Sequence, residues 1–244
     1  MERFRNGKNK IFCLPYAGGS ASIYFDWRQK YDAVAQTIPI EYNGRASLFG
    51  TELYQNADEA AEDVCNKICA DNPQNYIIYG HSMGCLIALL TAIKIEKRGY
   101  KHLPKAVIIG GMRPPHLKYL DQSLAHLPKD VLMRIIFSLG QVDSRIMNEP
   151  QLLDMMYKVI QSDLKICEDY EYTEALPGIN VPIIAMTAKH DDEAPLDDME
   201  EWARYTSGNF HIKEFDANHF FPFNCEEFDD YYGKMIVKAD KNQL

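Results

Sequence analysis

Short runs of apolar residues recur along the chain, and between them apolar residues repeat every three or four positions. The short runs are residues 10–14, 37–42, 76–79, 106–109, 183–186 and 210–215. Most are rich in β-branched side chains, which is typical of strands in a parallel sheet that is buried on both faces. The pattern therefore predicts a mostly parallel sheet of six strands.

Segments with helical spacing lie between these runs. Apolar residues recur at every third or fourth position from Ala60 to Ile68, before Asp71-Asn72-Pro73, and from Leu86 to Ile93, before Gly99. Proline and glycine commonly mark such helix ends. Strand and helix alternate in this way in α/β folds, in which right-handed crossovers place helices on both faces of the sheet.

The stretch from about 113 to 172 differs because it contains no strand pattern. It is predicted to form helices interrupted by Pro128, Gly140 and Pro150. This is longer than a simple crossover requires, and ligands bind at the carboxyl ends of the strands in open α/β sheets. We therefore expect a single domain, 1–244, with a helical lid insertion at about 113–172.

The composition excludes several classes of function. The chain carries 26 Lys and Arg against 35 Asp and Glu, a net charge of -9, whereas nucleic-acid binding requires a basic surface. The longest mostly apolar run, 85–93, is too short to span a bilayer, and residues 11–14 are too few for the apolar core of a signal peptide. We expect a cytoplasmic monomer with neither nucleic acid nor a membrane as its partner.

Six cysteines are scattered along the chain without a C-x-x-C pair. Neither a zinc site nor a disulfide framework is therefore indicated. Cys65 and Cys69 share a helix face, but two thiolates alone do not make a metal site. We expect reduced thiols and no metal.

The candidate chemistry begins at Gly80-His81-Ser82-Met83-Gly84, between the run 76–79 and a helical pattern. A serine at a strand-to-helix turn is held in a strained conformation that exposes its hydroxyl, and the flanking glycines permit the tight backbone. This context predicts a nucleophile elbow with Ser82 as the attacking group. The alternative is a glycine-rich turn without chemistry, because the five-residue pattern alone is not specific.

A serine nucleophile needs a base, and the base needs an orienting carboxylate. Around a nucleophile elbow these groups follow in the order serine, acid, histidine. Asp191 comes after the run 183–186 and is the candidate acid, with Asp192 as the alternative; His219 follows the last run and is the candidate base. A solvated acidic loop and a surface histidine would explain each residue taken alone, but the order of all three favours a catalytic triad.

The loop after the first run supplies a candidate oxyanion hole. It has the sequence Leu14-Pro15-Tyr16-Ala17-Gly18-Gly19-Ser20-Ala21. Paired glycines allow backbone N–H groups to converge on a developing negative oxygen. The predicted donors are the amides of Ala17 and of Met83, the residue after the nucleophile.

With these motifs together, the chain resembles the type II thioesterases of non-ribosomal peptide and polyketide synthesis and the related medium-chain thioesterases of fatty acid synthesis. The resemblance runs nearly end to end. The residues that carry it are 15–21, Tyr24, Trp27, 80–84, 113–116, 139–140, Asp163, Tyr170, Asp191, Trp202 and 219–221. It implies an α/β-hydrolase fold that hydrolyses acyl groups from the phosphopantetheine thiol of a partner carrier protein, without a cofactor.

Three positions depart from the family pattern. Tyr42-Asn43-Gly44-Arg45-Ala46-Ser47 stands where the family usually has Pro-Gly-Arg-Gly. Ala188 replaces a glycine before the acid, and Ala217-Asn218 replaces a glycine pair before the histidine; asparagine tolerates positive φ better than most residues. None of these departures removes a predicted reacting group.

Five of the ten methionines lie between Met112 and Met156. Flexible thioethers suit a surface that accommodates varied acyl chains, although packing of the insertion onto the core explains them equally well. Two other functions stay open: a carboxylesterase or lipase acting on oxygen esters, and an inactive hydrolase fold that serves as a binding subunit.

Overall fold

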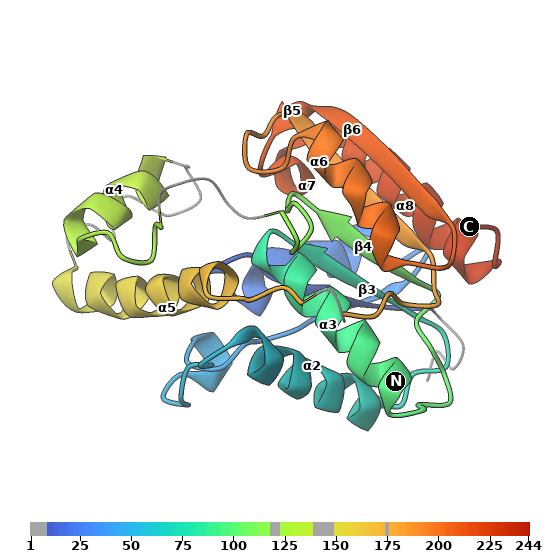
Figure 1. Cartoon of the computed structure of the whole chain (residues 1–244), viewed down its shortest axis with the longest axis horizontal. Coiled ribbons are helices and arrows are strands. Elements are labelled where there is room, and N and C mark those ends of the chain that lie inside the picture. The colour runs from blue at the N-terminus through green and yellow to red at the C-terminus, as the bar shows by residue number, and fades with distance from the viewer. Residues whose placement is uncertain (1–8, 118–122, 139–148, 174–175) are drawn as a thin grey trace.

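The structure is a computed structural model that describes residues 9–117, 123–138, 149–173 and 176–244. Its centre is a six-stranded sheet in the order β2-β1-β3-β4-β5-β6, and every neighbouring pair is parallel (Figure 1). The strands are β1 (Lys10–Leu14), β2 (Gln36–Pro39), β3 (Tyr76–His81), β4 (Ala106–Gly110), β5 (Ile183–His190) and β6 (Phe210–Asn218). The predicted mostly parallel α/β sheet is confirmed.

Each predicted run contains a strand, but several strand ends differ. β5 and β6 continue past the predicted ends and remain paired as far as His190 and Asn218, where polar side chains replace the apolar pattern. β2 ends at Pro39 instead of residue 42. This strand lies at the edge of the sheet, the position that tolerates a proline without an N–H donor.

Helices connect the strands and cover the sheet. The longer ones are α2 (Ala57–Asp71), α3 (Met83–Lys97), α4 (Lys129–Ser138), α5 (Pro150–Glu168) and α8 (Glu226–Asp240). The short ones are α1 (Trp27–Lys30), α6 (Leu196–Glu200), α7 (Phe221–Asn224) and the 3₁₀ helices η1 (Ala21–Tyr24), η2 (Ala46–Leu48) and η4 (Glu201–Tyr205). None of the helices in the described ranges is long and apolar enough to cross a bilayer.

Alternating side chains divide the core into two layers. On β1, Phe12 and Leu14 belong to the cluster covered by α2 and α3, whereas Ile11 and Cys13 belong to the cluster covered by α1 and α8. Successive side chains of a strand point to opposite faces, so both faces of the sheet are apolar and both need helices. This explains the continuous apolar runs in the sequence.

Between β4 and β5, the described residues form α4 and α5 and no strand. Both helices lie beyond the sheet on the side where α3 begins, to the left in Figure 1. α4 begins directly after Pro128 and α5 begins with Pro150, as the proline positions predict, while Gly140 lies outside the described residues. Leu132, Met133 and Ile160 form a small apolar cluster between the two helices.

Candidate active site

Ser82 occupies the sharp turn between β3 and α3. Its φ of 51° and ψ of -123° lie in a region that residues other than glycine rarely adopt. Such strain persists only where the surrounding structure enforces it. Here the Ser82 amide donates a hydrogen bond of 2.8 Å to the carbonyl of Gly110 on the neighbouring strand β4.

Two glycines allow the backbone to pack closely around this turn. A Cβ atom on Gly80 would lie 2.1 Å from the carbonyl oxygen of Gly84, and one on Gly84 would lie 2.3 Å from the carbonyl oxygen of Leu14. Both distances are far below contact distance, so neither position accepts a side chain without a shift of the backbone. The motif therefore forms a nucleophile elbow for steric reasons.

The predicted acid and base form a hydrogen-bonded pair. Asp191 follows β5, His219 follows β6, and Nδ1 of His219 lies 2.8 Å from Oδ2 of Asp191. The Asp191 side chain is 1 % exposed and the His219 side chain 20 %. A buried carboxylate at Nδ1 holds the proton there and leaves Nε2 free to accept one.

The structure distinguishes the two candidate acids by their contacts. Asp192 is exposed and its carboxylate makes no contact with His219 in the described part of the chain. Its carbonyl accepts a hydrogen bond of 3.3 Å from Arg113 instead. Asp191 is therefore the carboxylate that can orient His219.

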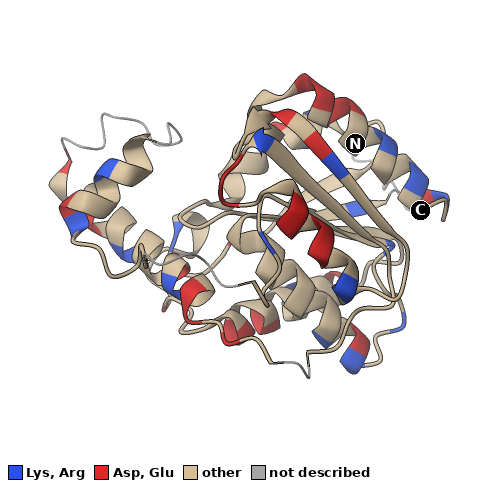
Figure 2. Ribbon diagram, turned by 45° about the horizontal axis from the view of Figure 1, so that its top comes forward, with Lys and Arg blue, Asp and Glu red and all other residues tan. Residues whose placement is uncertain are grey.

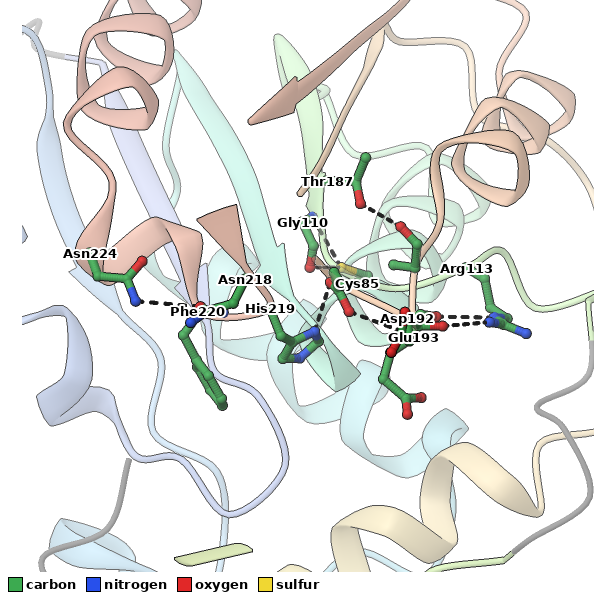
Figure 3. A network of polar contacts seen from close by, with 12 residues as sticks. Cys85, Gly110, Arg113, Thr187, Asp192, Glu193, Asn218, His219, Phe220 and Asn224 are labelled. Atoms are coloured by element: carbon green, nitrogen blue, oxygen red, sulfur yellow. Dashed lines mark hydrogen bonds and ion pairs between the residues drawn. The ribbon is translucent and has the colours of Figure 1, made fainter. Parts of the chain in front are cut away.

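Arg113 and Thr187, which the sequence did not indicate as functional residues, hold the loop that carries Asp191 (Figure 3). Nε of Arg113 donates to the carbonyl of Glu193 at 3.0 Å, and the amide of Glu193 donates to Oδ1 of Asp191 at 3.1 Å. Thr187 donates to the carbonyl of Ala194 at the other end of the loop. Arg113 belongs to the motif 113–116, so the resemblance contained a signal for it, whereas nothing marked Thr187.

The turn that carries His219 is closed by Asn218. Its Oδ1 accepts hydrogen bonds of 3.0 Å from the Phe220 amide and 3.4 Å from Nδ2 of Asn224 (Figure 3). The tolerance of asparagine for positive φ is not used, because Asn218 has a negative φ. The side chain compensates for the missing glycine pair by accepting these bonds.

Contacts around Gly111 connect the acid–base pair to the elbow. A Cβ atom there would lie 3.3 Å from Cε1 of His219 and 3.4 Å from Oδ2 of Asp191. The carbonyl of the preceding residue, Gly110, accepts the hydrogen bond from the Ser82 amide. Within the described residues no hydrogen bond joins Ser82 Oγ to His219, and such contacts often form only when substrate is bound.

His81 lies beside the site but is buried completely. Its ring centroid is 5.0 Å from that of His219. Burial lowers the pKa of His81 well below its usual value, and the neighbouring His219 lowers it further. His81 is therefore neutral and packs behind the elbow. It adds no positive charge beside His219.

The first loop contacts the elbow. The Gly19 amide donates to the Tyr16 carbonyl at 2.9 Å, and Gly18 has a φ of 79°. This combination is typical of a type II turn, which requires positive φ at its third residue. In the described part of the chain, the amides of Ala17 and Met83 donate no loop or turn hydrogen bond to a protein acceptor.

The described residues contain no group of three or more His, Cys, Asp or Glu side chains arranged to hold a metal ion. All six cysteines lie in the described ranges, and none forms a disulfide.

The parallel sheet, the strained serine at a strand-to-helix turn and the histidine–aspartate pair define an α/β-hydrolase. The model of the thioesterase domain family matches residues 9–234. The chain therefore belongs to the thioesterase domain family and is a serine hydrolase that acts on thioesters.

Individual relatives agree with this assignment. The chain is 28% identical over 228 residues to thioesterase PikA5 of Streptomyces venezuelae, covering 91% of this chain and 79% of the relative. It is 24% identical to the medium-chain S-acyl fatty acid synthase thioesterase of Rattus norvegicus, covering 93% and 88%. Among solved structures, the RedJ thioesterase from the prodiginine pathway of Streptomyces coelicolor superimposes with a TM-score of 0.83 at 28% identity, covering 94% and 85%.

Proposed function

We propose that the protein is a type II thioesterase that removes acyl, aminoacyl or peptidyl groups from the phosphopantetheine thiol of a carrier protein in non-ribosomal peptide or polyketide synthesis. The observation that carries the proposal is the buried Asp191–His219 pair beside a strained Ser82 in a chain of the thioesterase domain family. Relatives named for gramicidin S biosynthesis and for the prodiginine biosynthetic pathway support the pathway class.

In the proposed acylation, Ser82 Oγ attacks the thioester carbonyl while Nε2 of His219 takes the hydroxyl proton. Asp191 stabilises the imidazolium through Nδ1. The carbonyl oxygen becomes an oxyanion, and the Ala17 and Met83 amides donate to it. When the C–S bond breaks, the thiolate leaves with the proton from His219, and the acyl group remains on Ser82.

Deacylation repeats the sequence with water. His219 takes a proton from water as the water oxygen forms a bond to the acyl carbonyl carbon. The second oxyanion accepts hydrogen bonds from the same two amides. The C–O bond to Ser82 then breaks, His219 returns its proton to Oγ, and the free acid leaves. The proposal uses no metal and no cofactor other than the phosphopantetheine arm of the partner.

The charge distribution restricts where a carrier protein would dock. Acidic residues occupy the first turn of α6 (Asp197, Asp198) and of α8 (Glu226, Glu227, Asp229); Figure 2 colours Asp and Glu red along the ribbon. Carrier proteins are typically acidic as well, and like charges disfavour contact. We therefore propose docking away from α6 and α8, on a cytoplasmic monomer.

Replacement of the nucleophile tests the function. Ser82→Ala is expected to reduce hydrolysis of an acyl-carrier thioester by about 10⁶-fold without loss of folding, whereas Ser207→Ala, a distant serine, leaves the rate unchanged. Substantial turnover by folded Ser82→Ala would refute the proposal. Faster hydrolysis of a matched oxygen ester would instead indicate an esterase, and failure of a fluorophosphonate to label Ser82 would indicate a binding subunit.

A further inference from the structure

A buried ion pair joins α5 to the segment after β2. Arg45 Nη1 lies 2.6 Å from Asp163 Oδ2, and Nη2 lies 2.7 Å from Oδ1. The two residues are 118 positions apart in the chain, and they are only 6 % and 1 % exposed. The fork geometry uses both carboxylate oxygens, which is the strongest arrangement for such a pair.

The same pair holds the glycine turn of the first loop on both sides. The Gly18 amide donates to Oδ2 of Asp163 at 2.7 Å, and Nη1 of Arg45 donates to the carbonyl of Gly19 at 3.0 Å. Hydrogen bonds to charged partners are about twice as strong as neutral ones. Consecutive residues of one turn are thus bound to opposite charges.

Packing reinforces this contact. Ile160 lies one helical turn before Asp163 on α5, and a Cβ atom on Gly18 would lie 2.5 Å from its Cγ1. α5 therefore rests directly on the turn and leaves space for glycine alone.

Apolar side chains of similar volume often replace a buried ion pair at no cost in stability. Stability alone therefore does not require Arg45 and Asp163 to be charged. What apolar side chains cannot do is accept the Gly18 N–H. Asp163 fixes the direction of the peptide between Ala17 and Gly18, since a reversed peptide would direct the Ala17 carbonyl at the carboxylate.

We propose that Arg45 and Asp163 are positioning residues that hold the glycine turn so that the Ala17 amide faces the oxyanion. This inference rests on the proposed function, because it assigns the Ala17 amide a role in that reaction. The pair touches no reacting atom; it acts through the turn. Its loss is expected to weaken transition-state binding selectively and to leave ground-state binding of the thioester intact.

Two variants separate positioning from stability. The double variant Arg45→Met with Asp163→Leu retains an apolar contact but no acceptor for the turn, and Arg45→Lys retains the charge without the fork. We expect kcat to fall about 10- to 100-fold in the double variant, which is the scale of a misplaced catalytic group. In Arg45→Lys kcat should fall less. KM should be unchanged in both variants. Asp154→Asn, an exposed carboxylate on the same helix that pairs with Lys129, is the matched control.

A transition-state analogue provides the second measurement. An acyl trifluoromethyl ketone adds to Ser82 Oγ and places its oxyanion on the predicted amides, so its Ki should rise by the same factor as kcat falls. Unchanged kcat and Ki in either folded variant, or a rise in KM alone, would overturn the inference. A wild-type enzyme that cleaves a p-nitrophenyl ester but no carrier thioester would contradict the proposed function, and the Ki comparison would still test the pair.

Discussion

The Asp191→Asn substitution changes one atom of the site and should remove most of its activity. In the native loop, Oδ1 of Asp191 accepts the Glu193 amide at 3.1 Å, and Oδ2 faces Nδ1 of His219 at 2.8 Å. The amide oxygen of asparagine must take the position of Oδ1, because only an oxygen can accept the Glu193 N–H. The NH₂ group then faces His219.

A donor at that position reverses the tautomer of the histidine. Nδ1 becomes the acceptor, the proton moves to Nε2, and Nε2 no longer takes the proton of Ser82. The wrong tautomer costs about 10⁴ in kcat in a serine protease triad, which corresponds to about 5 kcal/mol of activation free energy. We expect a loss of this size, with KM little changed because the substrate does not touch Asp191.

The assay is steady-state release of thiol from an acyl-pantetheine thioester, with thermal unfolding to verify the fold. Asp192→Asn is the matched control, since its carboxylate is exposed and makes no contact with His219; its kcat should stay within about twofold, as for surface substitutions. If Asp191→Asn retained more than a tenth of wild-type kcat, or Asp192→Asn lost as much, the assignment of the acid would be wrong.

Three further predictions concern the elbow and its surroundings. Gly84→Ala places a Cβ 2.3 Å from the Leu14 carbonyl and should lower the free energy of unfolding by about 1–3 kcal/mol, measured by urea denaturation; unchanged stability would contradict the steric argument. Ser82→Gly should be more stable than Ser82→Ala by about 1 kcal/mol, because glycine adopts a φ of 51° without strain, and equal melting temperatures would count against it. His81 has a lowered pKa, so the unfolded chain binds a proton that the folded chain does not, and stability should fall as pH drops below about 6.5 by up to about 1.4 kcal/mol per unit. His81→Phe should flatten this dependence in urea titrations at several pH values, and an unaltered slope would exclude His81 as its source.

Much of the fold was predictable because burial on both faces imposes a continuous apolar run on each strand. The ends of β5 and β6 were not, because their last residues include Lys189, His190 and Asn218. His190 and Asn218 pair with each other beyond an irregularity at Lys189, while their side chains leave the core. Side-chain polarity therefore marks where burial ends and not where the strand ends.

The candidate site divides in a similar way. Ser82 and His219 follow from local sequence and chain order, since each stands directly after a recognisable strand. The choice between Asp191 and Asp192 depends on which side chain the loop turns toward His219, and neighbouring carboxylates look alike in a sequence. The Arg45–Asp163 pair connects residues 118 positions apart, so no local pattern could indicate it.

The close approach of Gly80, Gly84 and Leu14 has a consequence for redesign of this enzyme. Main-chain atoms alone set the location of the elbow, because the atoms that would meet an added Cβ on Gly80 or Gly84 belong to the backbone. The attacking oxygen thus keeps its place whichever side chains line the approach to it. Substitutions of exposed side chains such as Leu152 and Met155 of α5 should therefore leave the nucleophile where it is.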